Sequence, residues 1–151
     1  MAREEVTVLI RRLPGSDDIS LPAYQTAEAV AMDLCAAVVD GTHLSPGEIM
    51  VVPCGFAIAI PVGFEGQIRP RSGLAARSGV TVVNSPGTID PDYRGEVKVA
   101  LINLGKTVFS IVRGMRIAQL LVVPVPRVRW VQVEELPETT RGDGGFGHTG
   151  Q

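Results

Sequence analysis

Short apolar runs separated by turn-forming residues are the dominant pattern along this 151-residue chain. Most of the 11 prolines have Gly, Asp or Ser close by, and the runs between them are rich in Val and Ile. Runs of this length and spacing are typical of β-strands, whereas prolines inside longer helices would break them. The expected strands lie at 6–10, 49–52, 56–60, 79–83, 97–102 and 108–112. The pattern therefore predicts an all-β domain.

One further run, at 117–125, is almost continuously apolar and contains Gln119 as its single polar residue. A strand that is apolar on both faces is buried on both, in the core or against another subunit. From the residues alone, the favoured interpretation of Gln119 is a core amide that is hydrogen-bonded to backbone. Only the stretch 73–77 has a helical composition, so we expect one short helix.

The composition predicts a single domain with a substantial core, since 45% of the residues are hydrophobic. We assign residues 1–140 to this domain and residues 141–151 to a flexible, glycine-rich C-terminal arm. Cys35 and Cys54 have neither metal-ligand nor redox spacing and are expected to be small core residues.

The charge balance narrows the classes of partner. The net charge of −2 argues against a nucleic-acid-coating protein, because such proteins carry basic stripes that displace counterions. No apolar run reaches the length of a membrane span or resembles a signal peptide. We therefore expect a cytoplasmic protein with no membrane or nucleic-acid partner.

An unusual set of side chains lies in the segment 87–95, where glycines frame Asp90, Asp92 and Tyr93. Turn formation explains Asp92 well and Asp90 less well, and it does not explain an aromatic residue beside two acids. A general base, an aromatic wall and closely approaching main chain are what a small nucleotide or sugar substrate requires. The segment is therefore the first candidate for a reaction site.

Two other positions carry candidate chemistry. Arg71 and Ser72 lie where a strand is expected to end and the short helix to begin, an arrangement suited to an anion; alternatively, Ser72 is only the N-cap of the helix. Asp33 is embedded in an apolar run, and a buried carboxylate requires a cation or a hydrogen-bond network. A structural ion pair with an arginine such as Arg116 explains Asp33 as well as a catalytic role does.

The C-terminal segment 141–150 contains five glycines together with Arg141 and Phe146. Glycine-rich chain ends are usually disordered. A segment of this composition also resembles a lid, in which main-chain N–H groups wrap a phosphate while Phe146 covers a ring.

Five segments, taken in order, resemble the five motifs of the trimeric deoxyuridine triphosphate pyrophosphatases, the dUTPases. They are MDLCA at 32–36, PRSGL at 70–74, GTIDPDYRG at 87–95, GMRIAQL at 114–120 and RGDGGFG at 141–147. The resemblance implies a distorted jelly-roll β-sandwich with one short helix, assembled as a homotrimer. Each active site would combine motifs one, two and four of one subunit, motif three of a second, and the swapped C-terminal arm of a third.

The implied activity is hydrolysis of dUTP to dUMP and pyrophosphate, which keeps uracil out of DNA and supplies dUMP for thymidylate synthesis. By resemblance, Asp90 is the general base that activates a water for attack on the α-phosphorus. Tyr93 packs under the deoxyribose and excludes a 2′-hydroxyl group. Gln119 contacts the water or the α-phosphate, which replaces the core-amide interpretation. Asp33 assists through the water shell of the metal or by ordering Asp90.

The resemblance also implies a set of substrate contacts. The Asn84 amide and the main chain of a tight hairpin read the uracil edge, Arg71 holds the phosphates, Arg141 clamps the γ-phosphate and Phe146 stacks on the base. The complete expected set is Arg71, Ser72, Gly73, Asn84, Gly87, Ile89, Tyr93, Lys98, Arg141, Phe146, Gly147, His148 and Thr149. His148 stands where a serine is common in the family, with Thr149 as a substitute contact. The implied cofactor is Mg²⁺, held mainly by the triphosphate.

Two other functions are compatible with the same motifs. The dCTP deaminases share the fold and an Ile-Asp-Pro turn, but their catalytic glutamate aligns with Ala100 here. That alternative, or a bifunctional deaminase and dUTPase, therefore lacks its proton shuttle. The remaining alternative is a non-catalytic nucleotide-sensing module on the same scaffold.

Overall fold

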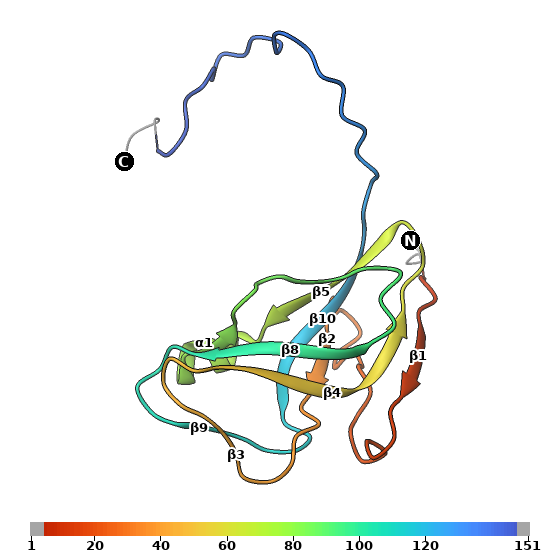
Figure 1. Cartoon of the computed structure of the whole chain (residues 1–151), viewed down its shortest axis with the longest axis vertical. Coiled ribbons are helices and arrows are strands. Elements are labelled where there is room, and N and C mark those ends of the chain that lie inside the picture. Colours follow the sequence, from red (N-terminus) through yellow and green to blue (C-terminus); the bar gives the residue numbers. More distant parts are fainter. Residues whose placement is uncertain (1–4, 148–151) are drawn as a thin grey trace.

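The computed structural model describes residues 5–147, which form two four-stranded antiparallel sheets, a two-stranded sheet and one short helix (Figure 1). The first sheet has the order β1-β4-β8-β6, the second β2-β10-β5-β7, and β3 pairs with β9. The elements are β1 (Leu9–Arg12), β2 (Met32–Cys35), β3 (Thr42–Leu44), β4 (Ile49–Ala59), β5 (Phe64–Pro70), α1 (Ser72–Ser78), β6 (Val80–Val82), β7 (Gly87–Ile89), β8 (Glu96–Asn103), β9 (Phe109–Ile111) and β10 (Arg116–Pro124). The expectation of a mainly β fold with one short helix is confirmed.

Each run expected to be a strand contributes to one, although two expected strands are joined. The runs at 49–52 and 56–60 form the single strand β4, because a bulge between Pro53 and Ala57 shifts the register without ending the pairing. Gly55 lies in this bulge with a φ of 77°. The short strands β2, β3 and β7 were not predicted from the apolar pattern, since their runs are brief. Of β5, which carries several polar residues, only the end before Arg71 was expected.

A single apolar core lies between the two four-stranded sheets. Val52 and Leu101 from one sheet pack in the same buried cluster as Ile68 and Leu120 from the other. Along β8, buried residues alternate with more exposed ones, as expected for a strand with one face on the core. The cysteines lie in or beside this core, as predicted: Cys35 and Cys54 are buried and free. Burial raises the pKa of the Cys54 thiol to about 12.

Strand β10 is one of the two inner strands of the second sheet. It pairs with β2 on one side and with β5 on the other. Ile117, Ala118, Leu120 and Leu121 are all buried, so successive side chains are covered on both faces. The predicted burial on both faces is therefore confirmed for the first half of the run, whereas Val122 and Val123 are only partly buried and Pro124 and Val125 are exposed in the single chain.

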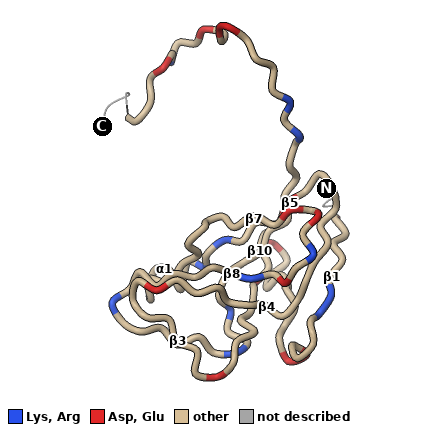
Figure 2. The backbone as a smooth tube through the Cα atoms, in the orientation of Figure 1, with Lys and Arg blue, Asp and Glu red and all other residues tan. Residues whose placement is uncertain are grey.

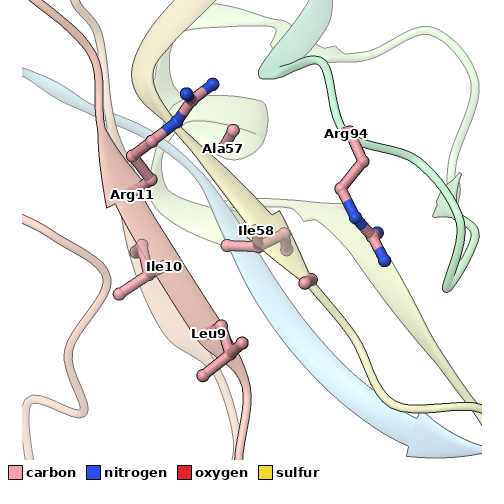
Figure 3. Close-up of a pocket in the computed structure, with 7 residues that line it drawn as sticks. Leu9, Ile10, Arg11, Ala57, Ile58 and Arg94 are labelled. Atoms are coloured by element: carbon pink, nitrogen blue, oxygen red, sulfur yellow. The ribbon is translucent and has the colours of Figure 1, made fainter.

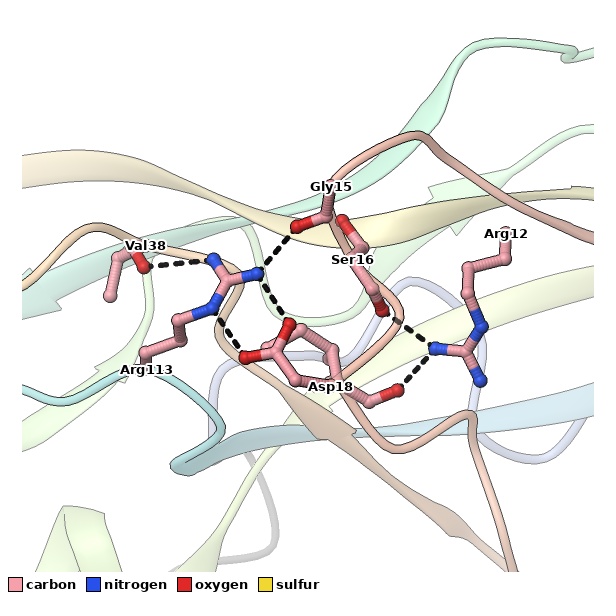
Figure 4. Close-up of polar contacts among 7 residues, drawn as sticks. Arg12, Gly15, Ser16, Asp18, Val38 and Arg113 are labelled. Atoms are coloured by element: carbon pink, nitrogen blue, oxygen red, sulfur yellow. Dashed lines mark hydrogen bonds and ion pairs between the residues drawn. The ribbon is translucent and has the colours of Figure 1, made fainter.

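Two arginines secure the loop that follows β1 (Figure 4). The Arg113 guanidinium donates to both carboxylate oxygens of Asp18 at 2.7 Å and to the carbonyl oxygen of Val38 at 3.2 Å. Arg12 donates to the carbonyl oxygen of Ser16 at 2.8 Å. The hydrogen bonds from Arg113 hold the pKa of the Asp18 carboxyl below its usual value.

The chain leaves the sandwich after β10. Residues 125–147 contain neither helix nor strand and extend away from the sheets (Figure 1). Several large side chains of this segment are exposed, among them Trp130 (90%), Leu136 (83%) and Phe146 (115%). The described part of the proposed arm, residues 141–147, therefore continues a longer extended segment. His148 and Thr149 lie outside the described residues.

Basic and acidic residues are interspersed over the sandwich (Figure 2). The one helix of the described part of the chain is too short to cross a membrane.

Candidate functional site

The segment 87–95 connects the two large sheets. β7 pairs with β5, whereas β8 pairs with β4 and β6. The expectation that this segment is a tight hairpin is therefore wrong, because the strands on its two sides do not pair with each other. The turn is closed instead by the N–H of Tyr93, which donates to the carbonyl oxygen of Asp90 at 3.1 Å. Arg94 adds hydrogen bonds to the carbonyl oxygens of Pro91 (2.6 Å) and Tyr93 (2.9 Å).

A pocket of about 180 Å³, here called the turn pocket, lies between this turn and strands β7 and β8. It is lined by Ile68, Asn84, Gly87, Thr88, Ile89, Asp90, Tyr93, Glu96, Val97 and Lys98. Asp90 is exposed, so its carboxylate is open to solvent in the single chain. The Tyr93 hydroxyl donates to the carbonyl oxygen of Glu96 at 2.9 Å, which fixes the far end of the ring. The turn pocket thus combines an accessible acid with a fixed aromatic wall.

Gly87 permits a close approach within the turn pocket. A Cβ atom at Gly87 would lie 3.2 Å from the Cβ of Ile68 and 3.4 Å from the Nδ2 of Asn84. The absence of a side chain therefore leaves the Asn84 amide close to the main chain of β7. An amide beside accessible main chain provides both donors and acceptors, as recognition of a planar base requires.

A second pocket of about 150 Å³, here called the arginine pocket, is lined by Asp33, Arg71, Ser72, Gly73 and Gln119. All five lining residues were predicted from the sequence. Strand pairing brings these residues together. Gln119 of β10 lies opposite Asp33 of β2 on one side and opposite Arg69 of β5 on the other. The end of β5 leads through Arg71 into α1. The arginine pocket offers a guanidinium group, a hydroxyl group and main-chain N–H groups, which is a chemistry suited to phosphate.

Asp33 lies between two guanidinium groups. Its Oδ1 accepts a hydrogen bond of 3.0 Å from the Nε of Arg71, and its Oδ2 is 3.5 Å from the Nη1 of Arg116. The Asp33 side chain is 14% exposed, so the carboxylate is largely withdrawn from water. Arg71 also donates to the carbonyl oxygen of Arg116 at 3.4 Å. The predicted arginine partner is confirmed, and Arg71 is a second partner that the sequence did not reveal.

Gln119 satisfies both interpretations of its amide. Its Nε2 donates to the carbonyl oxygen of Pro70 at 2.9 Å, as expected of a core amide. The side chain is nevertheless only half-buried and lines the arginine pocket. Among the described residues its Oε1 has no hydrogen-bond donor. This oxygen is therefore available to a water or a ligand.

Ser72 does not cap the helix. Arg71 occupies the N-cap position of α1, and no side-chain hydrogen bond caps that end. The alternative in which Ser72 is only a cap is therefore wrong. Its hydroxyl group is exposed and lines the arginine pocket.

A further pocket of about 330 Å³ lies over β1 and β4 (Figure 3). Its floor is apolar, with Leu9 and Ile58, and Arg11 and Arg94 flank it. The residues that line it include no carboxylate and no hydroxyl group, so none of them can activate a water. It is therefore not a candidate reaction site.

Several residues of the site were missed from the sequence. Ile68, Thr88, Glu96 and Val97 line the turn pocket without having been predicted. The period-two alternation of β8 was the available signal for Glu96, because it places Glu96 on the same face as Lys98. For Ile68 no local signal existed, since β5 reaches the pocket only through its pairing with β7.

The described residues of the predicted arm, 141–147, do not line either pocket within one chain. Arg141 donates to the carbonyl oxygen of Gly144 at 2.8 Å and is exposed, as is Gly147. Phe146 contacts no core and has a φ of 48°. The arm therefore carries a cation and an aromatic ring that have no covering surface in the described chain.

No group of three or more His, Cys, Asp or Glu side chains within residues 5–147 is arranged to hold a metal ion.

The arrangement at Asp33 generates a stability prediction. We expect Asp33→Asn to lower the free energy of unfolding by about 1 to 3 kcal/mol, because two guanidinium groups lose their shared counter-charge. Urea unfolding at neutral pH measures the change. Asp18→Asn is the matched control, since the Asp18–Arg113 pair is exposed and its loss should cost clearly less. Equal losses in the two variants would contradict the structural importance of the Asp33 pairs.

The chain has close relatives among known proteins. It is 56% identical over 153 residues to the deoxyuridine 5′-triphosphate nucleotidohydrolase of Wolbachia pipientis wMel, with all of both chains covered. It is 55% identical over 149 residues to the enzyme of the same name from Methylocella silvestris, covering 97% of this chain and 93% of the relative.

The fold comparison agrees with these relatives. The dUTPase of Staphylococcus bacteriophage 80alpha, solved with dUPNHPP, superposes with a TM-score of 0.86 at 25% identity. The alignment covers 96% of this chain and 99% of the phage protein. The dUTPase family model matches residues 17–150. The family model covers most of this chain, and relatives that align over nearly the whole chain are 55% and 56% identical to it. The chain therefore belongs to the dUTPase family.

Proposed function

We propose that this chain hydrolyses dUTP to dUMP and pyrophosphate. The observation that carries the proposal is the pair of pockets on one sandwich, one with an accessible acid beside an aromatic wall and one with an arginine, a hydroxyl group and a free amide oxygen. The full-length relatives named as dUTP nucleotidohydrolases support the same reaction.

The turn pocket takes the nucleoside. Asp90 acts as the general base, accepting the proton of the water that attacks the α-phosphorus, a role that contributes ~10²- to 10⁴-fold. Tyr93 packs under the deoxyribose and leaves no room for a 2′-hydroxyl group. Asn84 and the main chain beside Gly87 bind the uracil edge. Ile89 and Lys98 complete the walls of this pocket.

The arginine pocket takes the triphosphate. The Arg71 guanidinium, the Ser72 hydroxyl and the N–H of Gly73 bind phosphate oxygens, which exposes the α-phosphorus to the water. The unpaired Oε1 of Gln119 accepts a hydrogen bond from that water and orients it. Positioning and charge neutralisation supply most of the rate in such a site.

Asp33 acts mainly by fixing Arg71. Both of its carboxylate oxygens already face guanidinium groups, so little coordinating capacity remains for a metal. A role through the water shell of the cation is secondary to this positioning.

Mg²⁺ would be held mainly by the oxygen atoms of the substrate triphosphate. Mg²⁺ prefers oxygen ligands and retains several waters, so a site in which triphosphate oxygens supply most of the coordination suits a chain whose described residues form no metal cluster. When bound, the ion neutralises charge on the phosphates.

The working form is a homotrimer with a swapped C-terminal arm. The extended segment 125–147 presents Trp130 and Leu136 without any covering surface in its own chain. A groove of about 740 Å³ beside β10 exposes Tyr24 and Val30, and a second subunit would cover such a surface. In the trimer, Arg141, Gly147, His148 and Thr149 of the arm hold the γ-phosphate and Phe146 stacks on the uracil. Residues 1–140 then form the domain and 141–151 the clamp.

Deamination of dCTP is the alternative that shares this scaffold. The position aligned with the deaminase glutamate is Ala100, which lies in β8 opposite Val51. An alanine cannot shuttle a proton, so this alternative is not favoured.

The substrate class is tested by incubating the protein with dUTP, dCTP, dTTP and UTP in the presence of Mg²⁺. We expect pyrophosphate from dUTP and little from the other three nucleotides. The close main chain beside Gly87 should leave no space for the 5-methyl group of dTTP, and Tyr93 should exclude the 2′-hydroxyl group of UTP. The Asn84 amide and the main chain should bind the uracil edge and not the cytosine edge of dCTP. Ammonia released from dCTP would overturn the proposal, and binding of dUTP without turnover would indicate a sensor.

The assignment of the base is tested with Asp90→Asn. We expect kcat to fall by ~10²- to 10⁴-fold while KM for dUTP changes little, because the amide cannot accept the proton of the water. Steady-state kinetics measure both parameters. Asp92→Asn is the matched control within the same turn and should turn over dUTP at nearly the normal rate. Near-normal turnover by Asp90→Asn would remove Asp90 from the base role.

The arm is tested by deleting residues 141–151. The truncated protein should remain a folded trimer, since the sandwich core lies before residue 125, but kcat/KM should fall on the order of 100-fold through loss of the clamp. Light scattering gives the oligomeric state and pyrophosphate release gives the kinetics. Dissociation of the trimer on truncation would instead identify the arm as chiefly structural.

A further inference from the structure

Gly95 is a glycine whose backbone does not require one. Its φ does not lie in the positive range occupied by Gly55, Gly63 and eight other residues of the described chain, so an L-residue could adopt its backbone conformation. The reason for a glycine at this position must therefore be space rather than conformation.

The space is occupied by the ring of Tyr93, two positions earlier. A Cβ atom at Gly95 would lie 2.5 Å from the Tyr93 hydroxyl oxygen, 2.7 Å from its Cζ and 3.0 Å from its Cε2. Contacts of that kind are shorter than real Cβ atoms make, so the ring would have to move. By contrast, a Cβ at Gly41 or Gly114 would meet nothing within 4 Å. The Tyr93 ring is thus folded back onto the main chain of Gly95.

The ring is also fixed at its other boundaries. The ring hydroxyl group donates to the carbonyl oxygen of Glu96. The main chain of Tyr93 is also held, because its N–H donates to the carbonyl oxygen of Asp90 and its carbonyl oxygen accepts from Arg94. Tyr93 lines the turn pocket, whereas Gly95 does not. Because the Tyr93 ring forms a wall of the pocket, a group added at Gly95 would overlap that wall and displace it.

We propose that Gly95 is a positioning residue for Tyr93: by lacking a side chain, it lets the aromatic ring withdraw and so sets the depth of the sugar-binding part of the turn pocket. This inference rests on the proposed function, since it assigns the withdrawn ring to the sugar of dUTP. Because Asp90 and Tyr93 belong to one closed turn, the same contact also sets the distance between the aromatic wall of the sugar site and the general base, Asp90.

A double-mutant cycle between Gly95→Ala and Tyr93→Ala tests the proposal. In the wild-type background we expect Gly95→Ala to lower kcat/KM for dUTP on the order of 10- to 100-fold, mainly through KM, because the ring narrows the pocket. In the Tyr93→Ala background the same change should alter kcat/KM by no more than about twofold, since no ring remains to be displaced. Equal losses in both backgrounds, or no loss in the wild-type background, would overturn the proposal.

Tyr93→Phe separates the ring from its hydroxyl group. The ring carbons remain within 3.0 Å of the added Cβ, so Gly95→Ala should still impair dUTP turnover in this background. A loss that disappears with the hydroxyl group would show that the Glu96 hydrogen bond, and not the ring, is the partner of Gly95, and would overturn the proposal.

Thermal unfolding of the four proteins in the Gly95→Ala and Tyr93→Ala cycle, the wild type included, gives a readout that does not depend on activity. Gly95→Ala should lower Tm in the wild-type background and leave it nearly unchanged in the Tyr93→Ala background. If Gly95→Ala does not fold, the double variant should fold, and its failure to do so would assign Gly95 a structural role unrelated to Tyr93. If the wild-type protein does not hydrolyse dUTP, the proposed function fails, whereas the Tm cycle still decides whether Gly95 positions Tyr93.

Discussion

The antiparallel pairing of β10 with both β2 and β5 is the constraint on which the arginine pocket depends. Hydrogen-bonded register places Gln119 opposite Asp33 on one side and opposite Arg69 on the other. Three segments that are far apart in sequence, around residues 33, 69 and 119, thereby meet at one end of a sheet, a consequence of strand geometry rather than of local preference. A slip of one residue in either pairing would turn Gln119 away from the pocket.

The ion pairs of Asp33 stabilise this junction. A withdrawn carboxylate is costly to bury alone, and here the cost is offset by guanidinium groups from Arg71 and Arg116. The same contacts orient Arg71, which lies at the N-terminal end of α1 and lines the pocket. A structural interaction and the placement of a phosphate-binding cation are therefore one feature, and removal of Asp33 would affect both stability and binding.

The turn pocket depends on a different device, a connection that crosses from one sheet to the other. Because β7 and β8 belong to different sheets, residues 90–95 must span the edge of the sandwich, where they are exposed. Local hydrogen bonds from Tyr93 and Arg94 keep this exposed turn in one conformation. The contact of the Tyr93 ring with Gly95 adds a steric limit. A rigid turn at an exposed edge is a suitable site for chemistry that another subunit completes.

Much of the chemistry could be predicted from the sequence, because it depends on residue types at fixed local spacing. The apolar runs located most of the long strands. The five segments that contain Asp33, Arg71, Asp90, Gln119 and Arg141 were sufficient to identify the resemblance to the dUTPase family from the sequence alone. The short strands β2 and β7, the partnership of Asp33 with Arg71, and the crossing of residues 90–95 between sheets were decided only by the tertiary structure. Local patterns specify which face of a strand is buried, but the choice of partner strand depends on the packing of the whole core, which no short segment encodes.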